Sequence, residues 1–191
     1  IINKNNSKMF LEAKDLCDDE IIGILGSKNG DVIYADEIVF PDIPLSHGLK
    51  KFDEEVYCAF ISDAHVGSKV FFEEEFKDFL KWINGNYGND EQKNIAKKLK
   101  YLFIGGDLVE GVGIYPGQEG DLIIKDIYKQ YDYFTQLIKK IPNHIQIIIC
   151  PGNHDALRLT EPQPAIGKEY CKDLTEMNNV YMVSNPALVN I

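Results

Sequence analysis

The sequence predicts an α/β protein, in which a largely parallel sheet is preceded by the end of a small β module. Three observations carry this prediction. Short apolar runs alternate with longer segments of helical spacing after residue 55, which is typical of an α/β domain. Before residue 45 the pattern is that of a hairpin. Polar clusters follow the first three runs of the α/β part directly, where parallel strands usually present a ligand site.

Residues 1–45 have the pattern of the tail of a β module, too short to close by itself. Asn29-Gly30 separates two apolar runs, and this dipeptide is typical of a hairpin turn. Residues 1–20 carry little pattern, whereas strands are expected at 21–26, 32–35 and 38–40. Prolines and glycines then predict a linker, which we place at residues 46–55.

Residues 56–191 are predicted to form the α/β domain. Strands are expected at 56–61, 100–104, 145–150 and 180–183. Helices are expected at 71–87, 121–140 and 167–176, where apolar residues recur at helical spacing. This alternation predicts strands that lie between layers of helices.

The composition excludes several classes of protein. Apolar residues make up 45% of the chain and charged residues 26%, which is typical of a globular protein. The net charge of −10, without a basic stripe, argues against tight nucleic-acid binding by this chain alone. No membrane partner is expected, because the longest apolar run is about six residues and a membrane helix needs about 20. Four widely spaced cysteines predict buried free thiols in a reducing cytoplasm: Cys17, Cys58, Cys150 and Cys171.

Each of the first three strands of this domain is followed by residues that can bind a metal ion. The three clusters are Ser62-Asp63-Ala64-His65, Gly105-Gly106-Asp107-Leu108-Val109-Glu110 and Pro151-Gly152-Asn153-His154-Asp155. The carboxyl ends of parallel strands meet at one edge of a sheet, so the three loops can share a site. Carboxylate and imidazole groups together bind Mn²⁺, Fe²⁺ or Zn²⁺, and one aspartate can bridge two ions.

Each cluster taken alone has a plain structural explanation, since Gly-Asp and Gly-Asn are common in turns. The order D-x-H, G-D-x-x-E, G-N-H-D after successive strands is what points to a metal site. In this order the chain resembles the calcineurin-like metallophosphoesterases over residues 56–191. The resemblance implies the sandwich fold of that family and a two-metal hydrolase. Mn²⁺ is the preferred ion, with Mg²⁺, Fe²⁺ or Zn²⁺ as alternatives.

The resemblance also implies the metal ligands. Asp63 and His65 would hold the first ion. Asp107 would bridge both ions, and Asn153 would hold the second. Metal-activated water would then attack the phosphorus atom.

His154 is implied as the catalytic residue that protonates or stabilises the leaving group. Glu110 and Asp155 are expected to orient the ligands, although a plain structural role explains them equally well. The later motifs of the family supply three more histidines, and none follows His154 here. The other two histidines, His47 and His144, are expected to be exposed and without a role. The metallophosphoesterase domain is therefore interpreted as C-terminally incomplete.

Short sequence segments between the motifs, which we call phrases, resemble a narrower family, the small subunits of archaeal family D DNA polymerases. These phrases are Gly111–Gln118, Glu161–Ala165 and Ser184–Ala187. The resemblance implies an oligonucleotide-binding (OB) module at the N-terminus, 3′→5′ exonuclease activity on DNA 3′ ends, and a large polymerising subunit as partner. Two alternatives stay open: a stand-alone metallophosphoesterase, and a non-catalytic scaffold similar to eukaryotic polymerase B-subunits.

Overall fold

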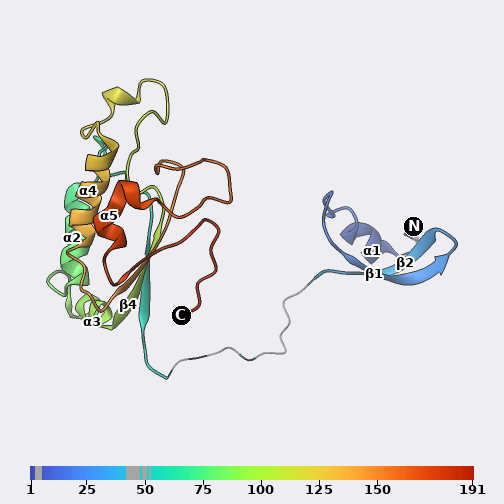
Figure 1. The fold of residues 1–191 in the computed structure, drawn as a ribbon. Helices are drawn as coiled ribbons and strands as arrows, with labels where there is room; N and C mark the ends of the chain where they lie inside the picture. Colours follow the sequence, from blue (N-terminus) through green and yellow to red (C-terminus); the bar gives the residue numbers. More distant parts are fainter. Residues whose placement is uncertain (3–5, 42–47, 49–50, 52) are drawn as a thin grey trace. The chain divides into compact units, whose positions relative to one another are not determined.

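A computed structural model describes residues 1–2, 6–41, 48, 51 and 53–191 of the chain. The chain divides into two compact units, Ile1–Phe52 and Asp53–Ile191 (Figure 1). His47 and part of the predicted linker lie outside the described residues.

The first unit contains an antiparallel hairpin and one short helix. Strand β1 (Gly23–Asn29) pairs with β2 (Val32–Val39), and Gly30 in the turn has a φ of 60°. The predicted interruption between 32–35 and 38–40 is wrong, because β2 runs through both segments and the irregularity in pairing falls at Leu25/Gly26 instead. These elements do not show an OB fold, which therefore stays a prediction.

The helix of the first unit, α1 (Ser7–Glu12), was not predicted. Asn6 caps it, because its side-chain oxygen accepts a hydrogen bond from the backbone N–H of Met9 at 3.3 Å. Met9 is buried against Ala35 and Ile38 of the hairpin. With six residues the helix is too short to show an apolar period in the sequence.

The second unit contains a four-stranded parallel sheet in the order β3-β4-β5-β6. Its strands are β3 (Tyr57–Ile61), β4 (Leu99–Gly105), β5 (Gln146–Cys150) and β6 (Val180–Met182). Its helices are α2 (Glu73–Ile83), α3 (Asp90–Lys98), a short 3₁₀ helix η1 (Gln118–Gly120), α4 (Ile127–Ile138) and α5 (Lys168–Thr175). The predicted α/β class is confirmed.

Two helices depart from the prediction. Helix α3 was missed because a capping box between Asn89 and Gln92 and charged ends stabilise it, rather than an apolar face. Helix α4 begins six residues later than predicted. The Asp126 carboxylate accepts hydrogen bonds from the N–H groups of Tyr128 and Lys129 at 2.9 and 3.1 Å, and this cap fixes the start of α4.

The helices of the second unit cover one face of the sheet. Each strand in the order β3-β4-β5-β6 lies on the same side of the one before it. Because crossovers between parallel strands are almost always right-handed, this order places the connecting helices on the same face of the sheet. Figure 1 shows α2, α4 and α5 together on one side of the sheet. The expectation of strands between two helix layers is therefore wrong for the part of the chain that the structure describes.

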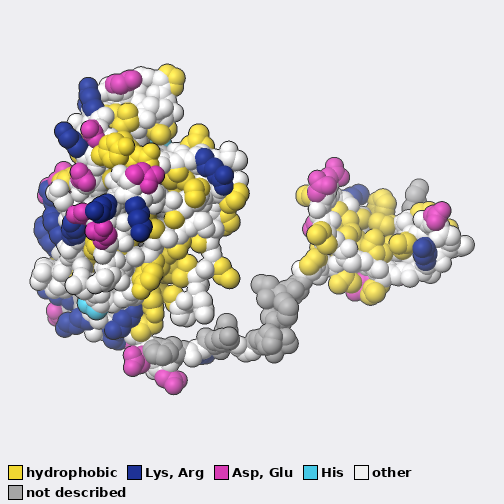
Figure 2. Space-filling view, viewed as in Figure 1, with side chains coloured by type: hydrophobic (Ala, Val, Ile, Leu, Met, Phe, Trp, Pro, Cys, Tyr) yellow, Lys and Arg dark blue, Asp and Glu magenta, His cyan; other side chains and the backbone are white. Residues whose placement is uncertain are grey.

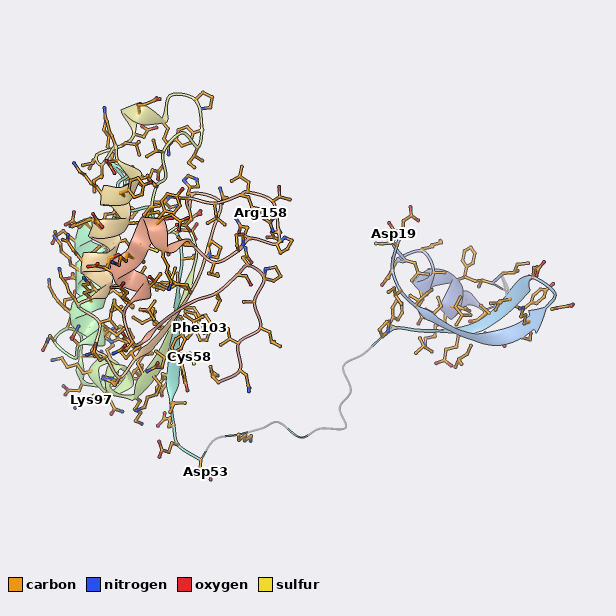
Figure 3. All side chains as sticks on the ribbon, in the orientation of Figure 1. Asp19, Asp53, Cys58, Lys97, Phe103 and Arg158 are labelled. Atoms are coloured by element: carbon orange, nitrogen blue, oxygen red, sulfur yellow. The ribbon has the colours of Figure 1, made fainter. Side chains whose placement is uncertain are left out.

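Burial along the strands agrees with this arrangement. Leu102 and Ile104 face the helices and are fully buried, whereas Phe60 on the opposite face is 74% exposed. Phe60 stacks on Phe103 of the next strand, with ring centroids 4.7 Å apart. Figure 3 labels Phe103 and Cys58 in this sheet. Figure 2 shows charged side chains over the helices and apolar ones gathered beside them.

The core lies between the sheet and the helices. It is made by fully buried side chains of α4, β4 and β5: Tyr131, Phe134, Leu137, Ile138, Leu102, Ile104, Ile147 and Ile149. Burying one such side chain contributes about 1.5–3 kcal/mol, so this layer fixes the strand ends from which the polar loops emerge.

All four cysteines are free thiols, as predicted. The expectation that they are buried holds for Cys171 alone: Cys150 is half-buried, and Cys17 and Cys58 are exposed. Cys58 is exposed because it lies on the sheet face that the helices leave open. Within the described residues, none of the helices combines the length and apolar character that crossing a membrane requires.

Candidate metal centre

The loops after β3 and β4 stay paired beyond the ends of their strands. The N–H of Asp63 donates to the carbonyl of Gly106 at 3.1 Å, and the N–H of His65 donates to the carbonyl of Asp107 at 3.0 Å. An isolated parallel bridge between Val66 and Val109 follows. The first two predicted clusters therefore lie side by side.

The loop after β5 approaches the second loop closely. Gly106 has a φ of 88°, and a Cβ atom on it would collide with the backbone of Gly152. A Cβ atom on Gly152 would collide with Asp107. These two positions therefore require glycine. The approach lets the N–H of His154 donate to Asp107 Oδ1 at 2.8 Å, which joins the third loop to the other two.

Three residues at this edge adopt the left-handed backbone conformation: Asp63 (φ 57°), His65 (φ 49°) and Asp107 (φ 49°). Among the described residues other than glycine, Asp19 alone shares a positive φ. Aspartate and histidine adopt this conformation more readily than most residues, but it still costs about 1–3 kcal/mol each. Strain at three predicted ligands is typical of a functional site rather than of ordinary turns.

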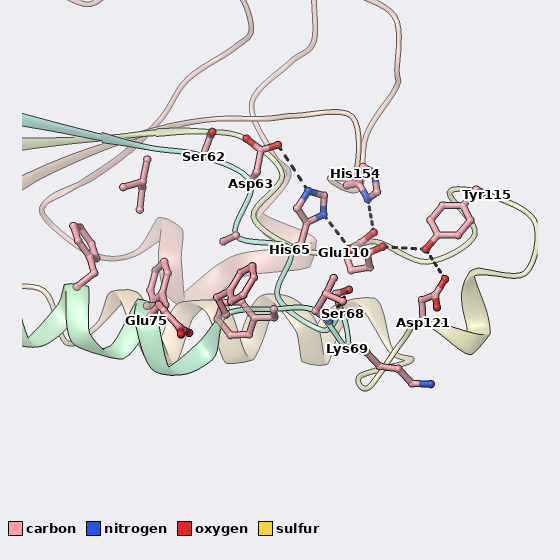
Figure 4. Close-up of a pocket in the computed structure, with 17 residues that line it drawn as sticks. Ser62, Asp63, His65, Ser68, Lys69, Glu75, Glu110, Tyr115, Asp121 and His154 are labelled. Atoms are coloured by element: carbon pink, nitrogen blue, oxygen red, sulfur yellow. Dashed lines mark hydrogen bonds and ion pairs between the residues drawn. The ribbon is translucent and has the colours of Figure 1, made fainter.

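The three loops bring His65, Asp107 and His154 into one cluster, whose ligand atoms all lie within 4.8 Å of one another. Figure 4 shows two of these residues, His65 and His154, close together. His65 Nε2 lies 3.7 Å from Asp107 Oδ2 and 3.8 Å from Asp63 Oδ1. These distances are too long for hydrogen bonds, so the lone pairs of the imidazole nitrogen and of the two carboxylate oxygens remain available to a cation. The donor set of imidazole nitrogen and carboxylate oxygen fits a first-row divalent ion.

Glu110 contacts both histidines of the cluster. Its backbone carbonyl lies 2.8 Å from His154 Nδ1, which must therefore be the donor, so that Nε2 is the ring nitrogen left for other contacts. Its Oε2 lies 3.1 Å from His65 Nδ1, a buried nitrogen that has no hydrogen bond of acceptable angle. A buried carboxylate against an imidazole nitrogen is the usual arrangement behind a metal-binding histidine.

Asp155 is buried in the third loop. Its two carboxylate oxygens accept hydrogen bonds from the Tyr131 hydroxyl at 3.0 Å and the Gly152 N–H at 2.9 Å. The Tyr131 hydroxyl accepts a further bond from the N–H of Ala156 at 2.9 Å. Burial raises the pKa of Asp155 to about 6, despite these donors. Asp155 thus holds the loop in shape.

The remaining predicted residues lie further out. Asp63 is exposed at the rim, next to His65 but outside the three-residue cluster. Asn153 is exposed in the third loop. His144 is exposed in the turn before β5, as expected.

Sequence reasoning missed the polar residues that support Glu110. Gln118 is buried, and its amide donates to the Glu110 carbonyl at 3.0 Å. The Tyr115 hydroxyl donates to Asp121 Oδ2 at 3.0 Å and lies 3.5 Å from Glu110 Oε1. Both residues belong to the Gly111–Gln118 segment, and Gly111, where a Cβ atom would collide with the backbone of His154, is the signal that could have indicated this approach.

The cluster opens into a pocket of about 690 Å³, a volume within the usual range of small-molecule sites. Asp63, His65, Glu110 and His154 line its polar end (Figure 4). Phenylalanines around the start of α2 line much of the rest, together with Lys69, Glu75, Tyr115 and Asp121.

The profile of the calcineurin-like phosphoesterase family matches residues 57–189, which contain all three loops. The chain belongs to this family. The predicted resemblance to metallophosphoesterases is therefore confirmed.

Several curated relatives carry the name "DNA polymerase II small subunit". The relative from Methanocaldococcus jannaschii is 48% identical over 179 residues, which cover 93% of this chain and 30% of the relative. The relative from Archaeoglobus fulgidus is 47% identical over 180 residues, covering 94% and 36%. The relative from Methanothermobacter thermautotrophicus is 42% identical over 191 residues, covering 100% and 39%. The chain thus spans about a third of the length of these relatives, and the predicted resemblance to polymerase small subunits is confirmed.

Proposed function

We propose that this chain is part of a 3′→5′ exonuclease that hydrolyses DNA phosphodiesters and proofreads for a replicative archaeal DNA polymerase. The observation that carries the proposal is the cluster of His65, Asp107 and His154, built from three separate strand ends. The name of the relatives supports the polymerase context. The partner would then be the large catalytic subunit, the substrate a DNA 3′ end, and the compartment the cytoplasm.

We propose Asp63, His65, Asp107 and Asn153 as ligands of two divalent ions, with Mn²⁺ preferred over Mg²⁺, Fe²⁺ or Zn²⁺. The free oxygen of Asp107, the left-handed backbone at three of these residues and the mixed nitrogen and oxygen donors support the assignment. Two such ions, when bound, polarise a phosphate ester and lower the pKa of a water molecule.

His154 is proposed to act on the leaving oxygen. Because the Nδ1 proton is donated to the Glu110 carbonyl, Nε2 is the ring nitrogen left to face the substrate, and His154 with a proton on both nitrogens would donate the Nε2 proton to the departing 3′ oxygen. Glu110 would orient His65, and Asp155 would hold the loop that carries Asn153 and His154.

The domain division is also proposed: an OB-like module tail over 1–45, a linker over 46–55 and the metallophosphoesterase domain over 56–191. A non-catalytic scaffold is the less favoured alternative, because a scaffold gains nothing from strained backbone at Asp63, His65 and Asp107. A stand-alone phosphoesterase would not need the polymerase-like phrases between the motifs.

The proposal is tested on the full-length protein with a 5′-labelled oligonucleotide and Mn²⁺. We expect a ladder of products shortened from the 3′ end, and no ladder from Asp107→Asn. Asp132→Asn, an exposed aspartate on α4, is the matched control and should behave as wild type. An intact oligonucleotide with each of the four ions would refute the exonuclease. Hydrolysis of a simple phosphate ester but not of DNA would favour the stand-alone phosphoesterase.

A further inference from the structure

The pocket beside the candidate metal cluster is lined by His65 and His154, and it continues into an apolar half at the start of α2. We call this half the aromatic wall, and define it as Phe71, Phe72, Phe76 and Phe79. Neighbouring rings are tilted toward one another, with centroids 6.0 Å apart for Phe71 and Phe76 and 5.9 Å apart for Phe76 and Phe79. Figure 4 shows rings gathered between Glu75 and Ser68, below the loop that carries Asp63 and His65.

The members of the aromatic wall differ in how far they are buried and pack against the core. Phe71, Phe76 and Phe79 are half-buried and pack on the core. Phe72 is 74% exposed and is not among the residues packed against that core. It occupies the N-cap position of α2, where serine, threonine, aspartate or asparagine would be preferred, and it makes no side-chain capping bond. Neither the helix nor the core therefore explains a phenylalanine at this position.

The charge of the pocket limits what it can attract. The chain carries a net charge of −10, and Lys69 is the one lysine or arginine among the residues that line this pocket. Phosphate attraction, which dominates most nucleic-acid binding, is therefore weak here. Stacking of a base on an aromatic ring supplies affinity that does not depend on charge, and it tolerates any base because each has a π face.

We infer that the aromatic wall receives the base of the terminal nucleotide, with Phe72 stacked on it, while the scissile phosphodiester lies at the metal cluster. The inference rests on the proposed function, because it takes a DNA end as the ligand. Phosphate and base of one nucleotide are adjacent groups, and the two halves of the pocket that would receive them are continuous. Acceptance of every base suits an enzyme that must remove any terminal nucleotide.

The test measures binding to two oligonucleotides that differ only at the 3′ end, where one carries a base and the other an abasic sugar. A phosphorothioate at the terminal linkage slows hydrolysis, and fluorescence anisotropy gives the Kd for the full-length protein with Mn²⁺. We expect wild type to bind the intact end roughly tenfold more tightly, which is the size of one base–aromatic stack. Phe72→Ala should lose this preference, and Phe72→Trp should keep it.

Tyr87→Ala is the matched control, since Tyr87 is an exposed aromatic residue that follows the other end of α2 and does not line this pocket. It should keep the wild-type preference. The Tm of Phe72→Ala should equal that of wild type, because an exposed ring adds little to stability. A fall of more than about 5 °C would mean that protein, not DNA, covers the ring, and would overturn the inference.

Equal binding of both ends by wild type, or a preference that survives in Phe72→Ala, also overturns it. Failure of the proposed function gives a different result. If no DNA is cleaved but the Phe72-dependent preference is present, the exonuclease assignment fails and the base site stands. If DNA is cleaved with no preference for a terminal base, the exonuclease stands and the base site fails.

Discussion

The loops after β4 and β5 each bury one aspartate, and they use it in opposite ways. Asp155 is 3% exposed, and both of its oxygens accept hydrogen bonds, from the Tyr131 hydroxyl and the Gly152 N–H. Asp107 is 7% exposed, and its Oδ1 accepts from His154 N–H, whereas its Oδ2 faces His65 Nε2 at 3.7 Å.

This contrast teaches how a buried carboxylate can be assigned to structure or to chemistry. A buried acid whose oxygens are all occupied by protein donors already has its hydrogen bonds and holds a loop together. A buried acid with one oxygen that faces the lone pair of another candidate ligand, rather than a hydrogen-bond donor, instead needs a cation to balance its charge. Substitutions at and around the two aspartates therefore separate loss of metal binding from loss of stability.

The largest effect is expected for Asp107→Asn. Asparagine tolerates the left-handed backbone and can keep the bond from His154 N–H, so the loop should stay intact. It lacks the negative charge and the second oxygen that a bridging ligand needs. We expect Mn²⁺ binding by calorimetry and exonuclease activity to fall below detection, with the free energy of unfolding unchanged within about 0.5 kcal/mol. Tight binding of two ions by this variant would contradict the assignment.

The next effect concerns His154→Ala. If Nε2 acts on the leaving group, turnover should fall by about 10²- to 10⁴-fold while ions stay bound. The same cluster could instead use His154 as a ligand, since its ring nitrogen lies within reach of Asp107 and His65. Calorimetry on this variant separates the two roles. Loss of bound Mn²⁺ as severe as in Asp107→Asn would make His154 a ligand.

A smaller effect is expected for Glu110→Gln. This change removes the charge beside His65 Nδ1 and leaves the backbone carbonyl that holds His154 in place. Groups behind a metal ligand typically change metal affinity by about 10- to 100-fold, so we expect a Kd for Mn²⁺ raised by that factor. Glu91→Gln, at an exposed position of α3, should not change the Kd. An unchanged Kd for Mn²⁺ in Glu110→Gln would show that Glu110 has only a structural role.

The smallest effect on turnover is expected for Asp155→Ala, whose effect should fall on stability instead. The change leaves the buried Tyr131 hydroxyl and the Gly152 N–H without their acceptor, which costs about 1–3 kcal/mol. Urea unfolding measures the loss, and Tyr131→Phe should lose a similar amount through the same bonds. Activity per folded molecule should fall less than about tenfold. If Asp155→Ala kept the wild-type stability but no longer bound metal, Asp155 would belong to the metal site rather than to the structure of the loop.

The sequence predicted which loops meet at the candidate site better than it predicted their conformation. Aspartate and histidine directly after β-branched strands were visible as motifs, and parallel strands must bring such loops together. The left-handed backbone at Asp107 was not visible, because it depends on the loop after β5 packing against it. Glu110 was expected to orient the ligands, but its contact with His65 was not predicted, since Gln118 and Tyr115 from the turn that follows it contact its side chain.

Helix prediction failed where local bonds rather than an apolar face decide the structure. Helix α4 has buried residues on one side and was found, whereas α3 depends on Asn89, Gln92 and its charged ends. The single-sided helix layer was also missed. Periodicity reports that a strand is buried, but strand order decides which face the crossovers cover, and strand order is a long-range property.

The strand order of the second unit has a consequence for how the chain folds during synthesis. Each strand from β4 to β6 adds to the edge formed by the strand before it, so no described strand must insert between two that are already paired. Synthesis proceeds from the N-terminus, and units can fold as they emerge. We therefore expect the Asp63 loop to meet the Asp107 loop while the segment that carries His154 is still unmade. On this expectation the candidate site gains its three loops in chain order, with the loop of His154 last.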